Sequence, residues 1–132
     1  MLTLSKDMEV GITKIDSQHK ELVDRINAVT NMGLKSASTE ETKKTLDFLG
    51  EYIVVHFNDE EELQKQSNYP GYSAHKEQHR QFIMQFRDLN KEFIKNGASP
   101  RFTLGLNNSV INWIVRHIKT SDKEFGLFYN SK

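Results

Sequence analysis

Apolar residues recur three and four positions apart along four long segments of this 132-residue chain. Such spacing places them on one face of an α-helix, and no run of alternating apolar and polar residues indicates a β-strand. Short loops between such helices favour antiparallel neighbours. We therefore expect an all-α fold in one domain over residues 1–132, an up-down-up-down antiparallel four-helix bundle with an N-terminal arm and a short C-terminal helix.

Capping residues predict where the first two helices begin. Asp16 is a good N-cap, so the first helix is expected to start after it and to run to residues 30–33. Residues 1–15 would then form the arm. The sequence Ser-Thr-Glu-Glu at residues 38–41 is a capping box, which predicts that the second helix starts there and extends to about Gln66.

Turn residues delimit the second half of the chain in the same way. A third helix is expected over residues 72–95, because an Asn-Tyr-Pro-Gly turn precedes it and Asn-Gly follows it, ending at Gly97. A serine followed by Pro100 opens the fourth helix, which is expected to reach about Thr120. The tail, residues 121–132, is expected to form a short final turn or helix.

Composition excludes several classes of function. The chain has no cysteine, which rules out disulfides, thiolate zinc sites and cysteine-held iron–sulfur clusters. Its 18 basic and 18 acidic residues balance, which argues against nucleic-acid binding. Mean hydropathy is −0.64 and no apolar run approaches membrane-spanning length. Asp7 and Glu9 interrupt the position of a signal-peptide core, so we expect a cytoplasmic protein.

All five histidines fall on the predicted core faces of the helices. One glutamate, Glu60, falls there as well. The predicted core positions are Ile15, His19, Leu22, Ile26 and Val29 on the first helix, Leu46, Leu49, Ile53, His56, Glu60 and Leu63 on the second, His75, His79, Phe82, Phe86, Leu89 and Phe93 on the third, and Leu106, Val110, Trp113 and His117 on the fourth.

A buried carboxylate needs a compensating positive charge. Any single histidine on an apolar face is most simply a structural core residue, but five of five, together with Glu60, are costly to bury unpaired. No lysine or arginine occupies the predicted core positions. A metal centre supplies the missing charge, whereas a metal-free structural bundle does not.

Spacing within the helices supports a metal site. His56 and Glu60 are four residues apart, as are His75 and His79, so each pair lies on one helical face. The next carboxylate after His117 is Asp122, five residues on. Since five steps turn an ideal helix too far, the helix must loosen or bulge after His117 if Asp122 is to join the site.

The ligand types do not identify the metal. Five imidazoles and two carboxylates exceed what one tetrahedral zinc ion takes, and they suit two metal ions that share carboxylates. Nitrogen and oxygen ligation without thiolate is compatible with iron, copper, nickel or zinc. The spacing His-x-x-x-Glu also differs from the Glu-x-x-His of ferritin-like di-iron bundles.

Five motifs follow one another along the chain: GITKIDSQH at residues 11–19, HFNDEE at 56–61, Tyr-Pro at 69–70, HKEQH at 75–79, and WIVRHI at 113–118 with Asp122. Together they resemble the hemerythrins, specifically single-domain bacterial hemerythrins. The likeness covers about residues 4–128.

The resemblance implies reversible O₂ binding at a non-haem di-iron site with an oxo or hydroxo bridge. One iron would be held by three histidines and the other by two, and the second would keep a position open for O₂. The implied ligands of the first iron are His75, His79 and His117. Those of the second iron are His19 and His56, and Glu60 and Asp122 are the implied bridges. The implied walls of the O₂ pocket are Leu22, Phe57, Trp113, Ile114 and Ile118.

The resemblance implies an O₂-binding protein for storage, delivery or sensing and not an enzyme. Two other functions remain open from the sequence: a di-iron enzyme acting on peroxide or nitric oxide, and a metal reservoir or signalling input domain. O₂ is the expected partner, without nucleic acid or membrane, and the sequence identifies no protein partner.

Overall fold

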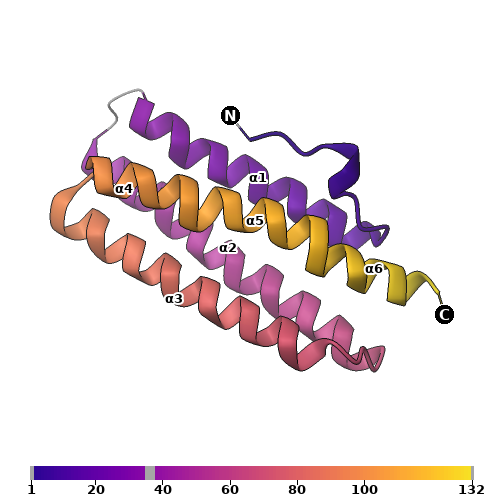
Figure 1. Ribbon diagram of the computed structural model, residues 1–132. Helices are drawn as coiled ribbons and strands as arrows, with labels where there is room; N and C mark the ends of the chain where they lie inside the picture. Colours follow the sequence, from indigo (N-terminus) through magenta and orange to yellow (C-terminus); the bar gives the residue numbers. More distant parts are fainter. Residues whose placement is uncertain (1, 35–37, 132) are drawn as a thin grey trace.

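The computed structural model describes residues 2–34 and 38–131, which form a four-helix bundle (Figure 1). Within these residues there is no β-strand, and none of the helices is long and apolar enough to cross a membrane. The elements are the 3₁₀ turn η1 (Lys6–Met8), α1 (Thr13–Leu34), α2 (Thr39–Gln66), α3 (Tyr72–Asn96), α4 (Pro100–Gly105), the π segment η2 (Leu106–Ile111), α5 (Asn112–His117), the π segment η3 (Ile118–Asp122) and α6 (Lys123–Asn130). The predicted fold class is confirmed.

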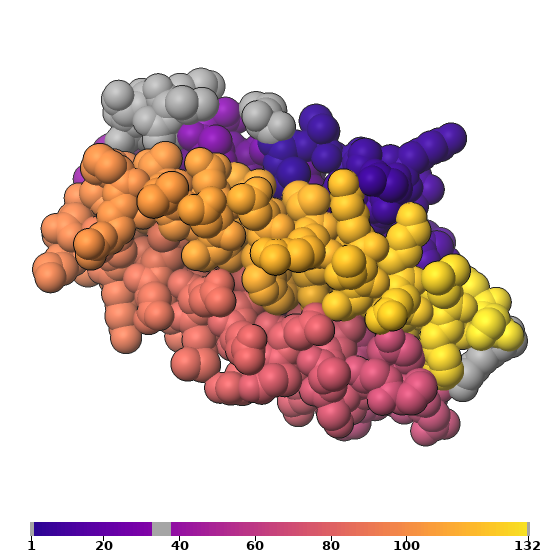
Figure 2. Space-filling view, in the orientation of Figure 1, coloured from indigo at the N-terminus to yellow at the C-terminus, as the bar shows by residue number. Residues whose placement is uncertain are grey.

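The fourth helix of the bundle is one continuous rod built from α4 to α6. It is α-helical except at η2 and η3, where backbone hydrogen bonds span five residues, such as Lys123 N–H to the Ile118 carbonyl. The sequence predicted an end near Thr120, but the rod continues through η3 into α6. Figure 2 shows this rod lying directly against α3 along one face of the molecule.

The predicted N-caps are confirmed at the starts of two helices, α2 and α4. The Ser38 hydroxyl accepts a hydrogen bond from the Glu41 amide at the start of α2. The Ser99 hydroxyl accepts one from the Phe102 amide, with Pro100 in the first position of α4. These side chains satisfy amide groups that have no partner within the helix.

The prediction that Asp16 caps α1 is wrong. The helix begins at Thr13, and Asp16 lies inside its first turn. Its carboxylate instead accepts hydrogen bonds from the amides of Val10 and Gly11, at 2.8 and 3.2 Å, and so fastens the arm to the helix. Gly11 adopts a φ of +86°, which glycine reaches without steric cost and which lets the chain turn into α1.

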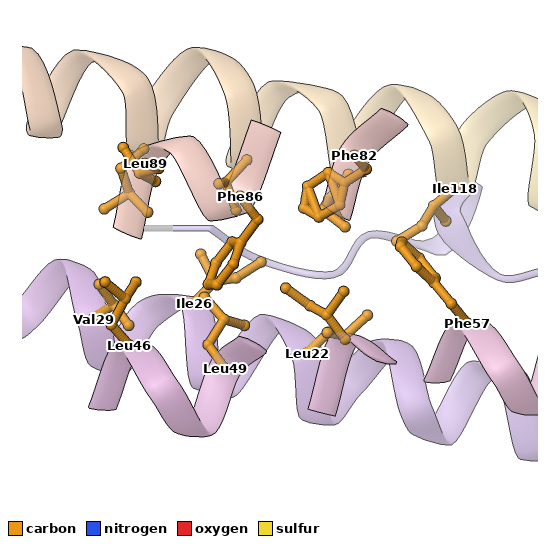
Figure 3. Packing of buried hydrophobic residues seen from close by; sticks show 14 of the residues in the cluster. Leu22, Ile26, Val29, Leu46, Leu49, Phe57, Phe82, Phe86, Leu89 and Ile118 are labelled. Carbon is orange, nitrogen blue, oxygen red and sulfur yellow. The ribbon is translucent and has the colours of Figure 1, made fainter. Parts of the chain in front are cut away.

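The core divides into an apolar part and a polar part along the bundle axis. Figure 3 places Val29 and Leu46 at one end of the apolar part, with Phe57 and Ile118 at the other. Nearly all the predicted core positions are buried. Two are not: Leu63 and Trp113 are only half-buried, and on α2 the buried position after Glu60 belongs to Gln64.

The N-terminal arm packs against the end of the fourth rod. Asn130 donates a hydrogen bond to the Gly11 carbonyl at 3.0 Å, and Lys123 donates one to the Asp7 carbonyl at 2.9 Å. The closest approach is at Gly126, where an added Cβ would lie 2.0 Å from the Val10 carbonyl oxygen. Only glycine fits there unless the arm moves.

We expect Gly126→Ala to destabilise the protein by about 1–3 kcal/mol, because the methyl group forces the arm backbone away. Denaturant unfolding measures this. Gly105→Ala is the matched control: its Cβ would meet only the tip of the Leu89 side chain, at 2.8 Å, which can shift. An alanine there gains about 1 kcal/mol of helix propensity. Equal stability of Gly126→Ala and the unmodified chain would contradict the arm position.

Candidate metal centre

Seven potential metal ligands meet in the polar part of the core, and each is at most 5% exposed. They come from all four rods of the bundle: His19 from α1, His56 and Glu60 from α2, His75 and His79 from α3, His117 from α5 and Asp122 from η3. The structure thus brings together every residue that the sequence nominated as a ligand. Their ligand atoms form two groups that share both carboxylates.

The first group contains three imidazoles around one oxygen of each carboxylate. Its members are His75, His79, His117, Glu60 and Asp122. The Nε2 atom of His117 lies 3.1 Å from that of His75 and 3.2 Å from that of His79. Glu60 Oε1 lies 2.7 Å from His75 Nε2 and 3.3 Å from His79 Nε2. Asp122 Oδ1 lies 3.0 Å from His75 Nε2 and 3.1 Å from His117 Nε2.

The second group contains two imidazoles and the other oxygen of each carboxylate. Asp122 Oδ2 lies 3.0 Å from His19 Nε2, and Glu60 Oε2 lies 4.0 Å from His56 Nε2. The rings of His19 and His56 meet edge to face, with centroids 4.8 Å apart. Each carboxylate therefore points one oxygen at each group of imidazoles.

The π segment η3 is what brings Asp122 into the site. With the wider turn after His117, Asp122 faces the bundle interior and is 1% exposed. The expectation that the helix loosens after His117 is confirmed. π segments inside α-helices are frequent at functional sites, since they reorient a side chain at a cost in helix regularity.

Two imidazoles are held from outside by residues that the sequence analysis did not identify. His56 donates from Nδ1 to the Gln18 side-chain oxygen at 2.7 Å, and Gln18 donates in turn to Asp59 at 2.7 Å. His79 donates from Nδ1 to the Glu61 carboxylate at 2.8 Å. A proton kept on Nδ1 leaves the Nε2 lone pair of each ring facing the site. The one available signal was adjacency, because Gln18 precedes a candidate ligand and Glu61 follows one.

The buried charges strongly perturb one another. Burial, and then the neighbouring Asp122 carboxylate, raise the pKa of Glu60 well above its usual range. Burial also disfavours charge on Asp122, but the imidazoles, His117 first, outweigh it and hold the pKa of Asp122 well below its usual range. Burial opposes a proton on His75, yet hydrogen bonds with Asp122 and Glu60 raise its pKa to about 9. Burial and the nearby His75 lower the pKa of His79 to about 2. These pKa shifts show that two full negative charges, one on Glu60 and one on Asp122, are unfavourable in the cluster without added positive charge.

The distances fit metal coordination. Two ligands at right angles on an ion about 2.1 Å away lie about 3.0 Å apart, and tetrahedral ligands lie about 3.4 Å apart. The separations of 2.7–3.3 Å between His75, His79, His117 and Glu60 are those of ligands that share one ion. The lone pairs of three imidazole nitrogens this close together repel one another unless a proton or a metal ion lies between them.

Aromatic rings cover the three-histidine group. Phe57 stacks on His79 with a centroid distance of 3.8 Å, and Trp113 stacks on His117 at 4.5 Å. Leu22, Ile114 and Ile118, the other predicted pocket walls, are buried in the adjoining core. A surface hollow of about 270 Å³ reaches Trp113 and His117.

The family of the hemerythrin HHE cation binding domain matches residues 10–127 of the chain. The bacteriohemerythrin of Methylococcus capsulatus is 31% identical over 111 residues, covering 84% of this chain and 82% of that protein. The myohemerythrin of Sipunculus nudus is also 31% identical over 111 residues, covering 84% and 79%. A crystal structure of wild-type hemerythrin matches with a TM-score of 0.83 at 28% identity, over 96% of this chain and 95% of that one. Sequence and fold thus agree with the buried ligand cluster, and the chain belongs to the hemerythrin family.

Proposed function

We propose that this protein binds O₂ reversibly at a pair of non-haem iron ions. The observation that carries the proposal is the pairing of carboxylate oxygens: Glu60 and Asp122 each direct one oxygen to the three-histidine group and one to the two-histidine group. A carboxylate placed in this way would serve as a ligand to an ion in each group. The relatives named bacteriohemerythrin and myohemerythrin support iron as the metal and O₂ as the ligand.

Each ligand has a role in this proposal. His75, His79 and His117 would hold one iron, and His19 and His56 would hold the other. Glu60 and Asp122 would be shared by the two ions, together with an oxo or hydroxo group. With one imidazole fewer, the group of His19 and His56 would leave a position free for O₂. The bound iron pair would supply that position and the electrons that O₂ takes up reversibly.

The protein's own contribution is to orient the ligands and to exclude water. Gln18 and Glu61 fix the rings of His56 and His79 through their Nδ1 hydrogen bonds. Leu22, Ile114 and Ile118 are buried beside the site, and apolar walls of this kind keep protons away from a bound ligand. We infer that residues 1–132 act as a single hemerythrin-like domain.

Loading the protein with ferrous iron without air and then admitting O₂ tests the function. We expect about two irons per chain and a coloured oxygenated form that disappears when O₂ is removed. Turnover of peroxide or nitric oxide, without a reversible oxygenated form, would favour the enzyme function instead. A colourless protein with less than one iron per chain would contradict the proposal.

Glu60→Gln should affect the metal-free and loaded proteins in opposite directions. Removing this charge should lower iron content below two per chain. The metal-free protein should keep or gain stability, because the raised pKa of Glu60 shows that its negative charge is unfavourable there and the amide is neutral. Elemental analysis and thermal unfolding measure the two effects. Glu62→Gln, on the same helix but exposed, is the control and should change neither. Full iron content in Glu60→Gln would exclude Glu60 as a required ligand.

Glu61→Leu should speed iron release to a chelator, because His79 loses the partner that orients its ring. Loss of such outer partners typically costs about 10–100-fold in metal affinity. Glu61→Gln should release iron more slowly than Glu61→Leu, since its amide oxygen can still accept the His79 Nδ1 proton. Equal release rates from both variants and the unmodified protein would show that Glu61 does not position His79.

A further inference from the structure

Gln64 is a fully buried polar residue that the proposed ligand set does not use. Its exposure is 0%, and it follows Glu60 by four residues on the buried face of α2. The position is firmly held, because the Gln64 carbonyl accepts hydrogen bonds from the Tyr69 amide at 2.9 Å and the Ser67 hydroxyl at 3.2 Å. The apolar neighbour Leu63 would be the ordinary choice for a core, yet Leu63 is only half-buried.

Neither polar atom of the Gln64 side chain has a hydrogen-bond partner among residues 2–34 and 38–131. The carboxamide offers two donors and one acceptor. Burying such a group without hydrogen-bond partners is unfavourable. Native proteins commonly resolve this with a buried water molecule that makes two to four hydrogen bonds.

A complementary atom is located one helical turn away. Glu60 Oε1 is engaged by His75 and His79, but Glu60 Oε2 is also buried and makes no hydrogen bond to the part of the chain that the structure describes. Side chains four residues apart on a helix are neighbours. The same face of α2 therefore holds an unused donor on Gln64 and an unused acceptor on Glu60.

Water satisfies both residues, whereas a direct contact would satisfy only one side of Gln64. The single free oxygen of Glu60 can pair with only one end of the Gln64 carboxamide, and the other end then stays without a partner. Water can accept from Gln64 Nε2 while donating to Glu60, and it can equally donate to Gln64 Oε1. A carboxylate oxygen has two lone-pair sites, so Glu60 Oε2 could accept from water and still bind a metal ion.

We propose that Gln64 and Glu60 share a buried water site, and that Gln64 acts through this water as a positioning residue for Glu60. The water site itself belongs to the metal-free protein. The positioning role rests on the proposed iron-binding function, because it concerns how Glu60 is presented to the ions. Outer hydrogen bonds to a ligating carboxylate orient it in the same manner as those to histidine.

The water site is tested first in the metal-free protein by NMR. We expect the Gln64 side-chain amide protons to show cross-relaxation with a water molecule of long residence time. In Gln66→Leu, where an exposed glutamine is replaced instead, this signal of Gln64 should persist. Absence of any long-lived water next to Gln64 in the unmodified protein would overturn the proposal, whatever the protein does with iron.

The positioning role is tested by iron release to a chelator. We expect Gln64→Leu to release iron about 10–100-fold faster than the unmodified protein and to shift the optical bands of the loaded site. Gln66→Leu is the matched control on the same turn, since Gln66 is exposed and bonds only to Glu62, at 3.2 Å. It should leave both readouts unchanged.

A purely structural role for Gln64 predicts a different pattern. It would lower the unfolding midpoint of the metal-free Gln64→Leu variant while leaving iron release and the optical bands unchanged, and that result would overturn the positioning role. Gln64→Met, unbranched and similar in length, provides the same comparison if the leucine variant does not fold. Failure of the unmodified protein to bind iron would instead contradict the proposed function and leave the NMR result on the water intact.

Discussion

The burial of two carboxylates at the centre of the bundle is the constraint on which the rest of the structure depends. Glu60 and Asp122 are at most 1% exposed and face five imidazoles and no lysine or arginine within hydrogen-bonding distance among the described residues. Two negative charges in such a place are unfavourable without cations. Proton sharing with His75 is a partial answer in the metal-free protein. The proposed metal centre would complete the compensation.

Both the backbone and the side chains of the helices accommodate this polar centre. The π segment η3 gives up regular α-helical hydrogen bonding to turn Asp122 inward. Gln18 and Glu61 occupy half-buried positions at the edge of the core, where their side chains can reach the outer nitrogens of His56 and His79. The apolar part of the core, which includes Ile26 and Phe86, has no such polar partners to accommodate and packs as an ordinary bundle (Figure 3).

Sequence periodicity was sufficient for the fold and for six of the seven nominated ligands, because these depend on which face of a helix a residue occupies. Asp122 lies off the helical repeat and reaches the site only through the π segment η3. Periodicity was insufficient where a side chain bonds to a partner outside its own helix, or where the buried position shifts by one residue near a helix end. Asp16 has good capping chemistry, but its carboxylate serves amides of the arm that lie outside the helix. On α2 the choice between Leu63 and Gln64 depends on one step of helical rotation near the helix end, and hydrophobicity alone selects the wrong one. The outer partners Gln18 and Glu61 could not be assigned because they act across helices.

X-ray absorption spectroscopy at the iron edge of the loaded protein tests the central claim most directly. The account predicts two irons per chain, each with nitrogen and oxygen neighbours, no sulfur, and a second iron as a resolved near neighbour. Substituting Glu60 or Asp122 should remove the iron–iron signal before it removes all iron. A single isolated iron per chain, with no iron neighbour in the unmodified protein, would contradict the assignment of two ions to one pair of shared carboxylates.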